Sequence, residues 1–401
     1  MAVIDNAAAA SPVPPLKERW APALQRLDRT LGPIGLGWIV PIIRLLIGDR
    51  PAQQIKEVWH GLLVPLIAIA CFLFMWAALA PRVVTSLGAI PGPTQVWEQA
   101  QVLWGDHLAE RDKEAAYYER QEKRNAAKLA ADPDAEVKWR TYIGRPTFVD
   151  QILTSLKTVF LGFLLASVIA IPLGVLCGLS PTFNAALNPI IQIFKPVSPL
   201  AWLPIVTMVV SAVYIEERAG MPKSFITSAV TVTLCSLWPT LINTAVGVAS
   251  IDRDLINVGR VLKLSWATKV FKVVLPSALP YIFTGLRLSL GVGWMVLIAA
   301  EMLAQNPGLG KFVWDEFQNG SSDSLARIMV AVLTTGIIGF LLDRVMVALQ
   351  AAVTHGPARG RGTQNRSRTP GRPGTLRHCA RACPRPASAR PRHSSAPPAY
   401  V

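Results

Sequence analysis

The chain has 401 residues, of which 51% are hydrophobic and 16% are charged, whereas a typical soluble domain has about 25% charged residues. This composition excludes an ordinary soluble enzyme and a disordered scaffold, and it indicates a polytopic membrane protein. The net charge of +15 comes mostly from residues 351–401, which hold ten Arg and no acidic residue, so it is weak evidence for nucleic-acid binding and we expect no nucleic-acid partner.

The N-terminal part of the chain predicts one membrane-spanning helix after a mixed segment. Residues 1–57 are expected to be a cytoplasmic segment. Within it, residues 31–48 are apolar but broken by two prolines and Arg44, which favours an interfacial helix or a helix packed on the bundle. Gly61–Ala80 contains no charge, and a helix of that length spans about 30 Å, the thickness of the hydrocarbon core. We therefore expect the first transmembrane helix at residues 58–80.

Residues 81–147 interrupt the hydrophobic pattern with ten basic and ten acidic side chains. The stretch Gln95–Ala131 lacks proline and is rich in Ala, Glu, Lys, Arg and Gln, which are strong helix formers. It predicts one or two soluble helices, ended by the Asp-Pro pair at 132–133.

Five further apolar segments predict five more transmembrane helices. The fold class expected is an all-α polytopic membrane protein with six transmembrane helices and an external helical insertion after the first. The spacing of Gly174 and Gly178 allows another helix to approach closely. The five segments are Leu156–Leu179, Ile190–Tyr214, Ser224–Gly247, Tyr281–Met302 and Leu325–Leu342.

The distribution of basic residues between the short loops predicts the orientation. The loop 248–280 carries five Lys or Arg, whereas the loops 215–223 and 303–324 on the other side carry three in total. Basic residues concentrate on the cytoplasmic side of membrane proteins. We therefore expect both termini and the 248–280 loop to be cytoplasmic and the 81–147 segment to be external.

The C-terminal residues 351–401 are rich in Arg and Pro and cannot bury enough apolar surface to fold. We expect a disordered tail that is a passenger without function, the alternative being contact with anionic lipid. Cys379, Cys383 and His378 in this tail are a poor ligand set, so no metal site is expected.

No catalytic constellation is present in the sequence, and we expect a transporter subunit rather than an enzyme. The run Gly308-Leu-Gly310-Lys311 resembles a fragment of a phosphate-binding loop. However, Gln305 stands where the first Gly should be and Phe312 replaces the Ser or Thr. Any nucleotide hydrolysis must therefore come from another chain.

The cytoplasmic loop between the fourth and fifth predicted spans carries the most information. Apolar residues repeat at helical spacing from Leu255, with charged residues between them, and Ser265 is a candidate cap for a second helix, Trp266–Val274. Pro276 and Pro280 are expected to end that helix and begin the next span. Two short helices with an apolar and basic outer surface suit docking into a groove on a cytosolic partner. The alternative is an amphipathic connector that lies on lipid.

This loop resembles the coupling loop of ABC importer permeases, whose pattern is E-A-A-x-x-x-G followed after about nine residues by I-x-L-P. Counted back from Leu275-Pro276, the family's Gly aligns with Lys263 and its E-A-A with residues 257–259, so the sequence departs from the pattern at the Glu and at the Gly. The resemblance covers residues 150–350. Segments that resemble the nitrate permeases of this family are Asn257–Ser265, Leu187–Ile205, Ala299–Leu303 and Val313–Phe317.

The resemblance implies a type I ABC importer permease, with five core helices in residues 150–350 and the coupling loop at residues 250–276. Such permeases act in pairs, and we expect a homodimer in the inner (plasma) membrane, surrounded by lipid. ATP would bind to separate cytosolic subunits, so no cofactor is expected on this chain, and an external, periplasmic substrate-binding protein would deliver the solute. The coupling residues implied are Asn257, Gly259, Arg260, Lys263, Leu264, Ser265 and Trp266.

The solute implied by the resemblance is nitrate or nitrite, with bicarbonate, cyanate or a sulfonate such as taurine as the alternative. A channel or an ion-coupled carrier is the alternative from a different class. It would predict inverted repeats and acidic residues buried in several spans. We find no clear repeat, and the acidic residues cluster in loops or at span edges.

Three residues are candidates for the translocation path: Arg287, Trp294 and Lys195. A charge inside a span is costly and indicates function, but Arg287 could instead pair with a carbonyl or an acid inside the bundle. Lys195 could snorkel to the interface, and Trp294 could serve packing. Glu301 lies too far along the helix to pair with Arg287 and is expected to anchor the external end.

Overall fold

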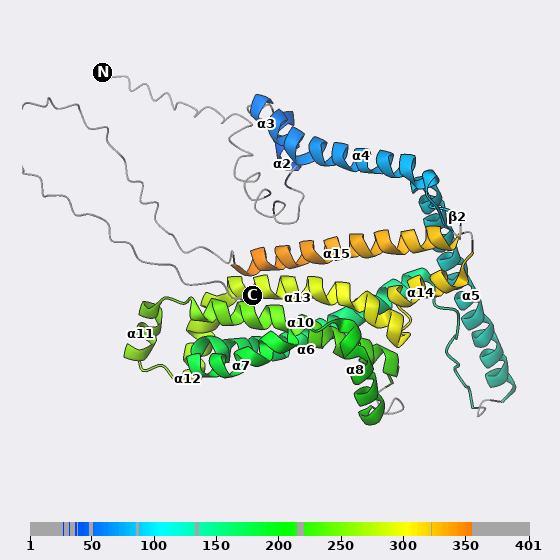
Figure 1. The fold of residues 1–401 in the computed structure, drawn as a ribbon. Helices are drawn as coiled ribbons and strands as arrows, with labels where there is room; N and C mark the ends of the chain where they lie inside the picture. The colour runs from blue at the N-terminus through cyan, green and yellow to red at the C-terminus, as the bar shows by residue number, and fades with distance from the viewer. Residues whose placement is uncertain are drawn as a thin grey trace, which may run out of the picture. The chain divides into compact units, whose positions relative to one another are not determined.

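The computed structural model describes residues 39–47, 51–85, 88–132, 136–214, 220–321 and 323–354, together with positions 27, 32 and 37. The expectations for most of residues 1–38 and for the tail beyond Thr354, including its cysteines, lie outside these residues. The described chain is almost entirely helical (Figure 1). Its α-helices are α2 (Ile39–Leu46), α3 (Pro51–Val58), α4 (Val64–Leu79), α5 (Pro93–Ala131), α6 (Phe148–Leu179), α7 (Pro181–Phe194), α8 (Pro199–Val213), α10 (Lys223–Ala249), α11 (Arg253–Val261), α12 (Trp266–Lys269), α13 (Leu275–Ala304), α14 (Leu309–Asn319) and α15 (Ser324–Thr354).

Five uninterrupted helical stretches are long and apolar enough to cross a membrane, which confirms five of the six predicted spans. The first includes α3 and α4, which a π-helical turn at Trp59–Leu63 joins into one helix. Besides helices, the described residues contain one antiparallel strand pair, β1 (Val84–Thr85) and β2 (Gly88–Ala89), between α4 and α5. The stretches are Pro51–Arg82, Phe148–Leu179, Lys223–Ala249, Trp266–Ala304 and Ser324–Thr354.

The third predicted span, residues 190–214, is not one continuous helix, although its two helices together are long and apolar enough for a broken span. The chain forms α7 and α8 there, and the two helices are bent by 102° at a short break. Pro196 and Pro199 supply no backbone N–H, so the helical ladder cannot continue through them. Ser198 begins the new helix, because its hydroxyl accepts a hydrogen bond from Leu200 N at 3.3 Å.

The expected helix end at Pro276 and Pro280 is also wrong. Helix α12 continues into α13, and together they form one helical stretch from Trp266 to Ala304. The π-helical turn Val270–Val274 joins them, with Leu275 N donating to Val270 O. The wider turn leaves Pro276 in the first turn of α13, where its missing N–H costs little.

Helices α6 and α10 pack at backbone distance because glycines line α6 on the contact side. A Cβ added at Gly174 would lie 2.8 Å from the Leu241 carbonyl oxygen, and one at Gly178 would lie 2.8 Å from the Ala245 carbonyl oxygen. The predicted close approach at this glycine pair is therefore confirmed. The same helix pair is in contact again at Gly162.

Helices α10 and α13 are joined by a hydroxyl that enters a helical ladder. Thr240 N donates to Ser289 Oγ at 3.1 Å, and Ser289 Oγ donates to the Ser236 carbonyl. The side chain of Ser289 thus bridges the donor and the acceptor of one helical turn beside Pro239 of α10. All three hydrogen-bonding residues are fully buried, so α6, α10 and α13 form the centre of the bundle.

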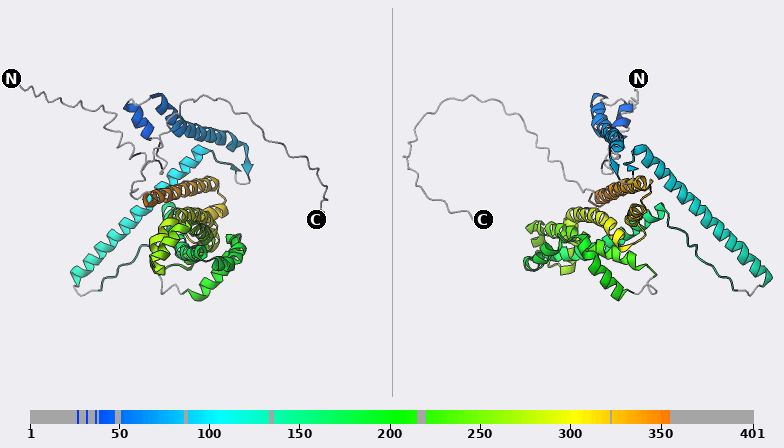
Figure 2. Two further views of the ribbon diagram at one scale, coloured as in Figure 1. Left: turned by 90° about the vertical axis from the view of Figure 1, so that its left-hand side faces the viewer. Right: turned by 45° about the vertical axis from the view of Figure 1, so that its right-hand side comes forward.

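The charged insertion is a single helix, α5, of 39 residues, which confirms the helical prediction for this segment. Figures 1 and 2 show α5 crossing the ends of α13 and α15 instead of running alongside them. Its first turns are held there by Val96 and Leu103, which pack with Phe312 of α14 and with Val330 and Ala331 of α15.

We predict that Gly174→Leu lowers the free energy of unfolding by about 2–3 kcal/mol, because the new side chain must push α10 away. The control is Gly336→Leu in α15, where a Cβ meets nothing within 4 Å. Thermal unfolding of both variants in lipid nanodiscs measures the difference. Equal midpoints for the two variants would contradict the close packing of α6 on α10.

Candidate coupling and translocation sites

The coupling loop, residues 250–276, presents apolar and basic side chains at one end of the bundle. Figure 1 places α11 and α12 at this end and α14 at the opposite end. Val261 is 82% exposed, and Leu262 and Trp266 are also mostly exposed. Asn257 and Lys263 are exposed beside them, whereas the side chain of Arg260 is outside the described part of the chain. The loop thus has the outer surface that its sequence predicts.

The turn between α11 and α12 closes as a Schellman motif around Lys263. Lys263 has φ of 48°, in the left-handed region, and Leu264 N donates to Gly259 O at 3.1 Å. This region costs a residue with a side chain about 1–2 kcal/mol and favours glycine. Lys263 is the position at which the ABC permease pattern has its Gly, so the backbone keeps the conformation although the residue differs.

Two further predicted coupling residues stabilise this turn. Leu264 Cδ1 lies 3.8 Å from the place of a Cβ on the buried Gly259, so the leucine covers the glycine. Ser265 caps α12, because its Oγ accepts from Thr268 N at 3.3 Å. The predicted cap at Ser265 is confirmed, and Trp266 follows it directly at the start of the helix.

Arg287 and Trp294 lie near each other in the middle third of α13. They line a cavity of about 250 Å³ between α13 and α15. Arg287 pairs with Asp343 of α15 through two hydrogen bonds, one of them from Nη2 to Oδ2 at 2.9 Å. Trp294 is buried and donates from Nε1 to the Thr335 carbonyl at 3.0 Å. Lys195, by contrast, is exposed at the end of α7 and is not among the lining residues.

The end of α13 opposite the coupling loop is fixed by a fully buried carboxylate, Glu301. Ser155 Oγ of α6 lies 2.7 Å and 2.9 Å from its two oxygens, and Gly310 N of α14 donates to Oε2 at 3.1 Å. Ser155 in turn accepts from Leu309 N at 2.9 Å. The carboxylate therefore ties α6, α13 and α14 together, a structural role that the expected external anchor did not include.

The glycine run after Glu301 is explained by this contact. A Cβ added at Gly310 would lie 2.1 Å from the Ile298 carbonyl oxygen, and one at Gly308 would lie 2.2 Å from Glu301 Oε1. The run Gly308–Lys311, which resembles a fragment of a phosphate-binding loop, thus covers the buried carboxyl group of Glu301. An acid inside an apolar run, followed by Asn-Pro-Gly-Leu-Gly, is the sequence signal that could have revealed it.

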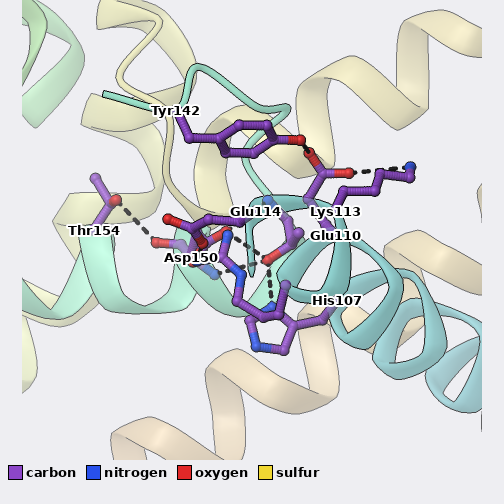
Figure 3. A network of polar contacts seen from close by, with 9 residues as sticks. His107, Glu110, Lys113, Glu114, Tyr142, Asp150 and Thr154 are labelled. Carbon is purple, nitrogen blue, oxygen red and sulfur yellow. Dashed lines mark hydrogen bonds and ion pairs between the residues drawn. The ribbon is translucent and has the colours of Figure 1, made fainter. Parts of the chain in front are cut away.

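A second polar network holds α5 to the start of α6 (Figure 3). His107 Nδ1 lies 2.7 Å from Thr147 Oγ1, and Arg111 donates to Asp150 Oδ2 at 3.0 Å. Thr147 is also the cap of α6, so the network fixes the point at which that helix begins. Sequence reasoning did not find these contacts, because the paired residues are about 40 positions apart.

Further polar contacts in the same region shift the pKa of one acid on α5. The Tyr142 hydroxyl donates to Glu110 Oε1 at 2.8 Å, and Lys113 Nζ lies 3.3 Å from Oε2. Both donors lower the pKa of the Glu110 carboxyl, and the bond to Glu110 raises the pKa of Tyr142. Glu110 and Lys113 also line a cavity of about 450 Å³ between α5, the start of α6, α14 and α15.

Comparison with known proteins gives the family. The model for the family described as "binding-protein-dependent transport system inner membrane component" matches residues 170–355. The bicarbonate transport system permease protein CmpB of Synechococcus elongatus is 35% identical over 308 residues, which is 76% of this chain and 94% of that protein. The chain belongs to this family of ABC importer permeases.

Two further matches accompany the family assignment. The nitrate import permease protein NrtB of Synechocystis sp. is 41% identical to this permease over 203 residues, 51% of this chain and 69% of that protein. A solved structure described as inward-facing conformations of the MetNI methionine ABC transporter aligns with a TM-score of 0.44 at 18% identity, covering 52% of this chain and 96% of that chain.

Membership confirms the recognition made from the coupling loop. The permease is a multi-pass inner-membrane subunit of an ABC transporter and not an enzyme in itself. Permeases of this family work with ATP-binding and substrate-binding partners.

We predict that Glu301→Gln destabilises the permease by about 3 kcal/mol. The new amide NH₂ would face a hydrogen-bond donor in the position where a carboxyl oxygen accepts in the wild type. The double variant Ser155→Ala with Glu301→Gln should be destabilised by much less than the sum of the two single variants, since both residues belong to one network. Thermal unfolding in nanodiscs measures both effects, with the exposed Glu122→Gln as the control. Strict additivity would contradict a shared network.

Proposed function

We propose that the chain forms the translocation path of an ATP-driven importer for nitrate or nitrite. The observation that carries this proposal is the 41% identity to a nitrate import permease over 203 residues, together with the nitrate-type segment Asn257–Ser265. Bicarbonate is the second candidate solute, because a bicarbonate permease is 35% identical over three quarters of the chain. Both anions are planar and carry one negative charge.

We also propose the arrangement of the subunits. The permease pairs with a second copy of itself, two ATPase subunits dock on the coupling loops from the cytoplasm, and an external binding protein delivers the anion to the opposite end. Both termini are then cytoplasmic. The exposed Val261, Leu262 and Trp266 would enter a groove of the ATPase, and Lys263 would meet acidic side chains at its rim.

Uptake by the complete complex tests the solute. The permease and its ATPase are reconstituted in proteoliposomes, with ATP on the side of the membrane that carries the ATPase. The binding protein is added on the opposite side, together with labelled nitrate or, in a separate experiment, labelled bicarbonate. We expect ATP-dependent uptake of nitrate that unlabelled nitrite inhibits. Uptake of bicarbonate alone would favour the second solute. Uptake that follows an ion gradient without ATPase would overturn the proposal in favour of a carrier.

Charge reversal on the coupling loop should weaken assembly. We expect Lys263→Glu combined with Arg260→Glu to lower the affinity for the ATPase about tenfold, because two positive charges of the loop become negative. Lys263→Gly is the matched control, since it removes the charge but suits the left-handed backbone and should fold at least as well. Affinity is measured by binding of the ATPase to permease in nanodiscs. Unchanged affinity in the double variant would remove these residues from the contact.

A further inference from the structure

The ion pair between Arg287 and Asp343 is bidentate: two N–H groups of the guanidinium, here called the fork, contact the two oxygens of a planar carboxylate. Arg287 donates from Nε to Oδ1 of Asp343 and from Nη2 to Oδ2. Two parallel N–H donors on one guanidinium fit two oxygens attached to one trigonal atom. The pair is only partly covered within the chain, because 42% of the Arg287 side chain and 30% of the Asp343 side chain are exposed. The contact is therefore open to a competing ligand.

Asp343 has a second cation as its partner. Arg344 Nη2 lies 2.9 Å from Asp343 Oδ2, the same oxygen that Arg287 Nη2 contacts. The Arg344 guanidinium also lies 5.1 Å from the centre of the Phe340 ring, which holds it in place. Two positive charges thus share one carboxylate, so the cluster has a net charge of +1. Asp343 stays paired even when Arg287 is taken away.

The cavity beside this fork has room for a small ion. Its volume of about 250 Å³ is several times the volume that one molecule occupies in liquid water, about 30 Å³. Among the described residues that line it, Arg287 is the cation and Asp343 the anion, and the other walls are apolar or glycine. Gly291 keeps one wall open, because a Cβ there would meet nothing within 4 Å. Trp294 already donates its N–H to Thr335, which leaves the guanidinium as the donor for a ligand.

We propose that this cavity is a subsite for a planar monovalent oxyanion, and that Asp343 is the built-in counter-ion that the oxyanion displaces from Arg287. The inference rests on the proposed function, because it takes the solute to be such an anion. Nitrate and bicarbonate present two oxygens on one trigonal atom, as a carboxylate does, so either can take over the fork. The occupied cluster has two positive and two negative charges, whereas the empty one has an unbalanced positive charge.

This exchange meets both demands on a transport site. The excess positive charge attracts the anion into the span, and the returning carboxylate of Asp343 competes with it so that it can leave. Because Asp343 and the solute compete for one fork, the carboxylate reduces the apparent affinity for the anion. A sulfonate can also place two oxygens on the fork, but its third oxygen and its substituent lie outside the plane of the fork, so it is expected to bind more weakly than a planar anion.

The test measures anion binding and transport separately on the same complex. Binding is followed as the rise of the unfolding temperature of the permease–ATPase complex in nanodiscs when sodium nitrate, or sodium bicarbonate, replaces sodium chloride at constant ionic strength. Methanesulfonate is the tetrahedral comparison. Transport is the ATP-driven uptake with saturating binding protein.

Removing the carboxylate of Asp343 should strengthen anion binding, whereas filling the cavity with a side chain should weaken it. We expect Asp343→Asn to lower the half-saturating nitrate concentration about tenfold and to slow uptake, because the anion no longer has a competitor. Gly291→Leu should abolish the nitrate-dependent rise, whereas Gly336→Leu, equally open but outside the cavity, should keep it. Arg287→Lys keeps the charge but loses the fork, and should reduce the preference for nitrate over methanesulfonate.

The failures of the two proposals are distinguishable. If the wild-type complex imports nitrate or bicarbonate but Asp343→Asn binds the anion no more tightly, or Gly291→Leu behaves as Gly336→Leu does, the ion pair is structural and the subsite is rejected. Absence of any nitrate- or bicarbonate-dependent stabilisation of the wild-type complex also rejects it. If the complex imports neither anion, the proposed function itself fails.

Discussion

The burial of one carboxylate sets the arrangement of three helices. Glu301 has no contact with water, so its two oxygens need donors, and these come from Ser155 of α6 and from the backbone of α14. A donor that moves by an ångström leaves a buried carboxyl oxygen without a partner, which costs more than a small change in apolar packing. The requirement holds α14 close over the end of α13 and explains why glycines occupy positions 308 and 310, where a side chain would take the space of the acid or of the backbone.

The same rule, that a buried polar group is most stable when it is hydrogen-bonded inside the protein, explains contacts of α10. Ser289 of α13 completes the ladder of α10 beside Pro239, and two threonine hydroxyls of α10 return to their own helix. Thr231 donates to the Thr227 carbonyl and Thr233 to the Ala229 carbonyl, each at 2.8 Å. Glycines let the backbones come close enough for such short side chains to reach. Polar contacts and small residues thus give the bundle a specificity that apolar packing in lipid does not supply.

The sequence allowed the helical class, five of the spans and the helix cap at Ser265 to be predicted, because hydropathy and local caps act over short distances. The 102° bend between α7 and α8 was missed although Pro196 and Pro199 mark it, because the apolar residues on both sides of these prolines made the segment resemble one span. The unbroken helix from Trp266 to Ala304 was missed because a proline ordinarily ends a helix and the π-helical turn leaves no compositional mark. Arg287 was selected as a candidate because it is a charge inside a span, whereas its pairing with Asp343, 56 positions away, was not predicted. The pairing of Glu301 with Ser155 joins residues 146 positions apart and could not be read from spacing.

One continuous helix connects the three sites described above. The stretch from Trp266 to Ala304 begins at the coupling loop, passes Arg287 and ends beside Glu301. The π-helical turn near its start closes from Val270 to Leu275 and so holds one residue more than an α-helical turn. Each residue advances a helix by about 100°, so that extra residue sets the rotational phase between the two ends. Deleting it would leave an unbroken rod, but the indole of Trp266 would face about a quarter turn away from its present bearing relative to the guanidinium of Arg287.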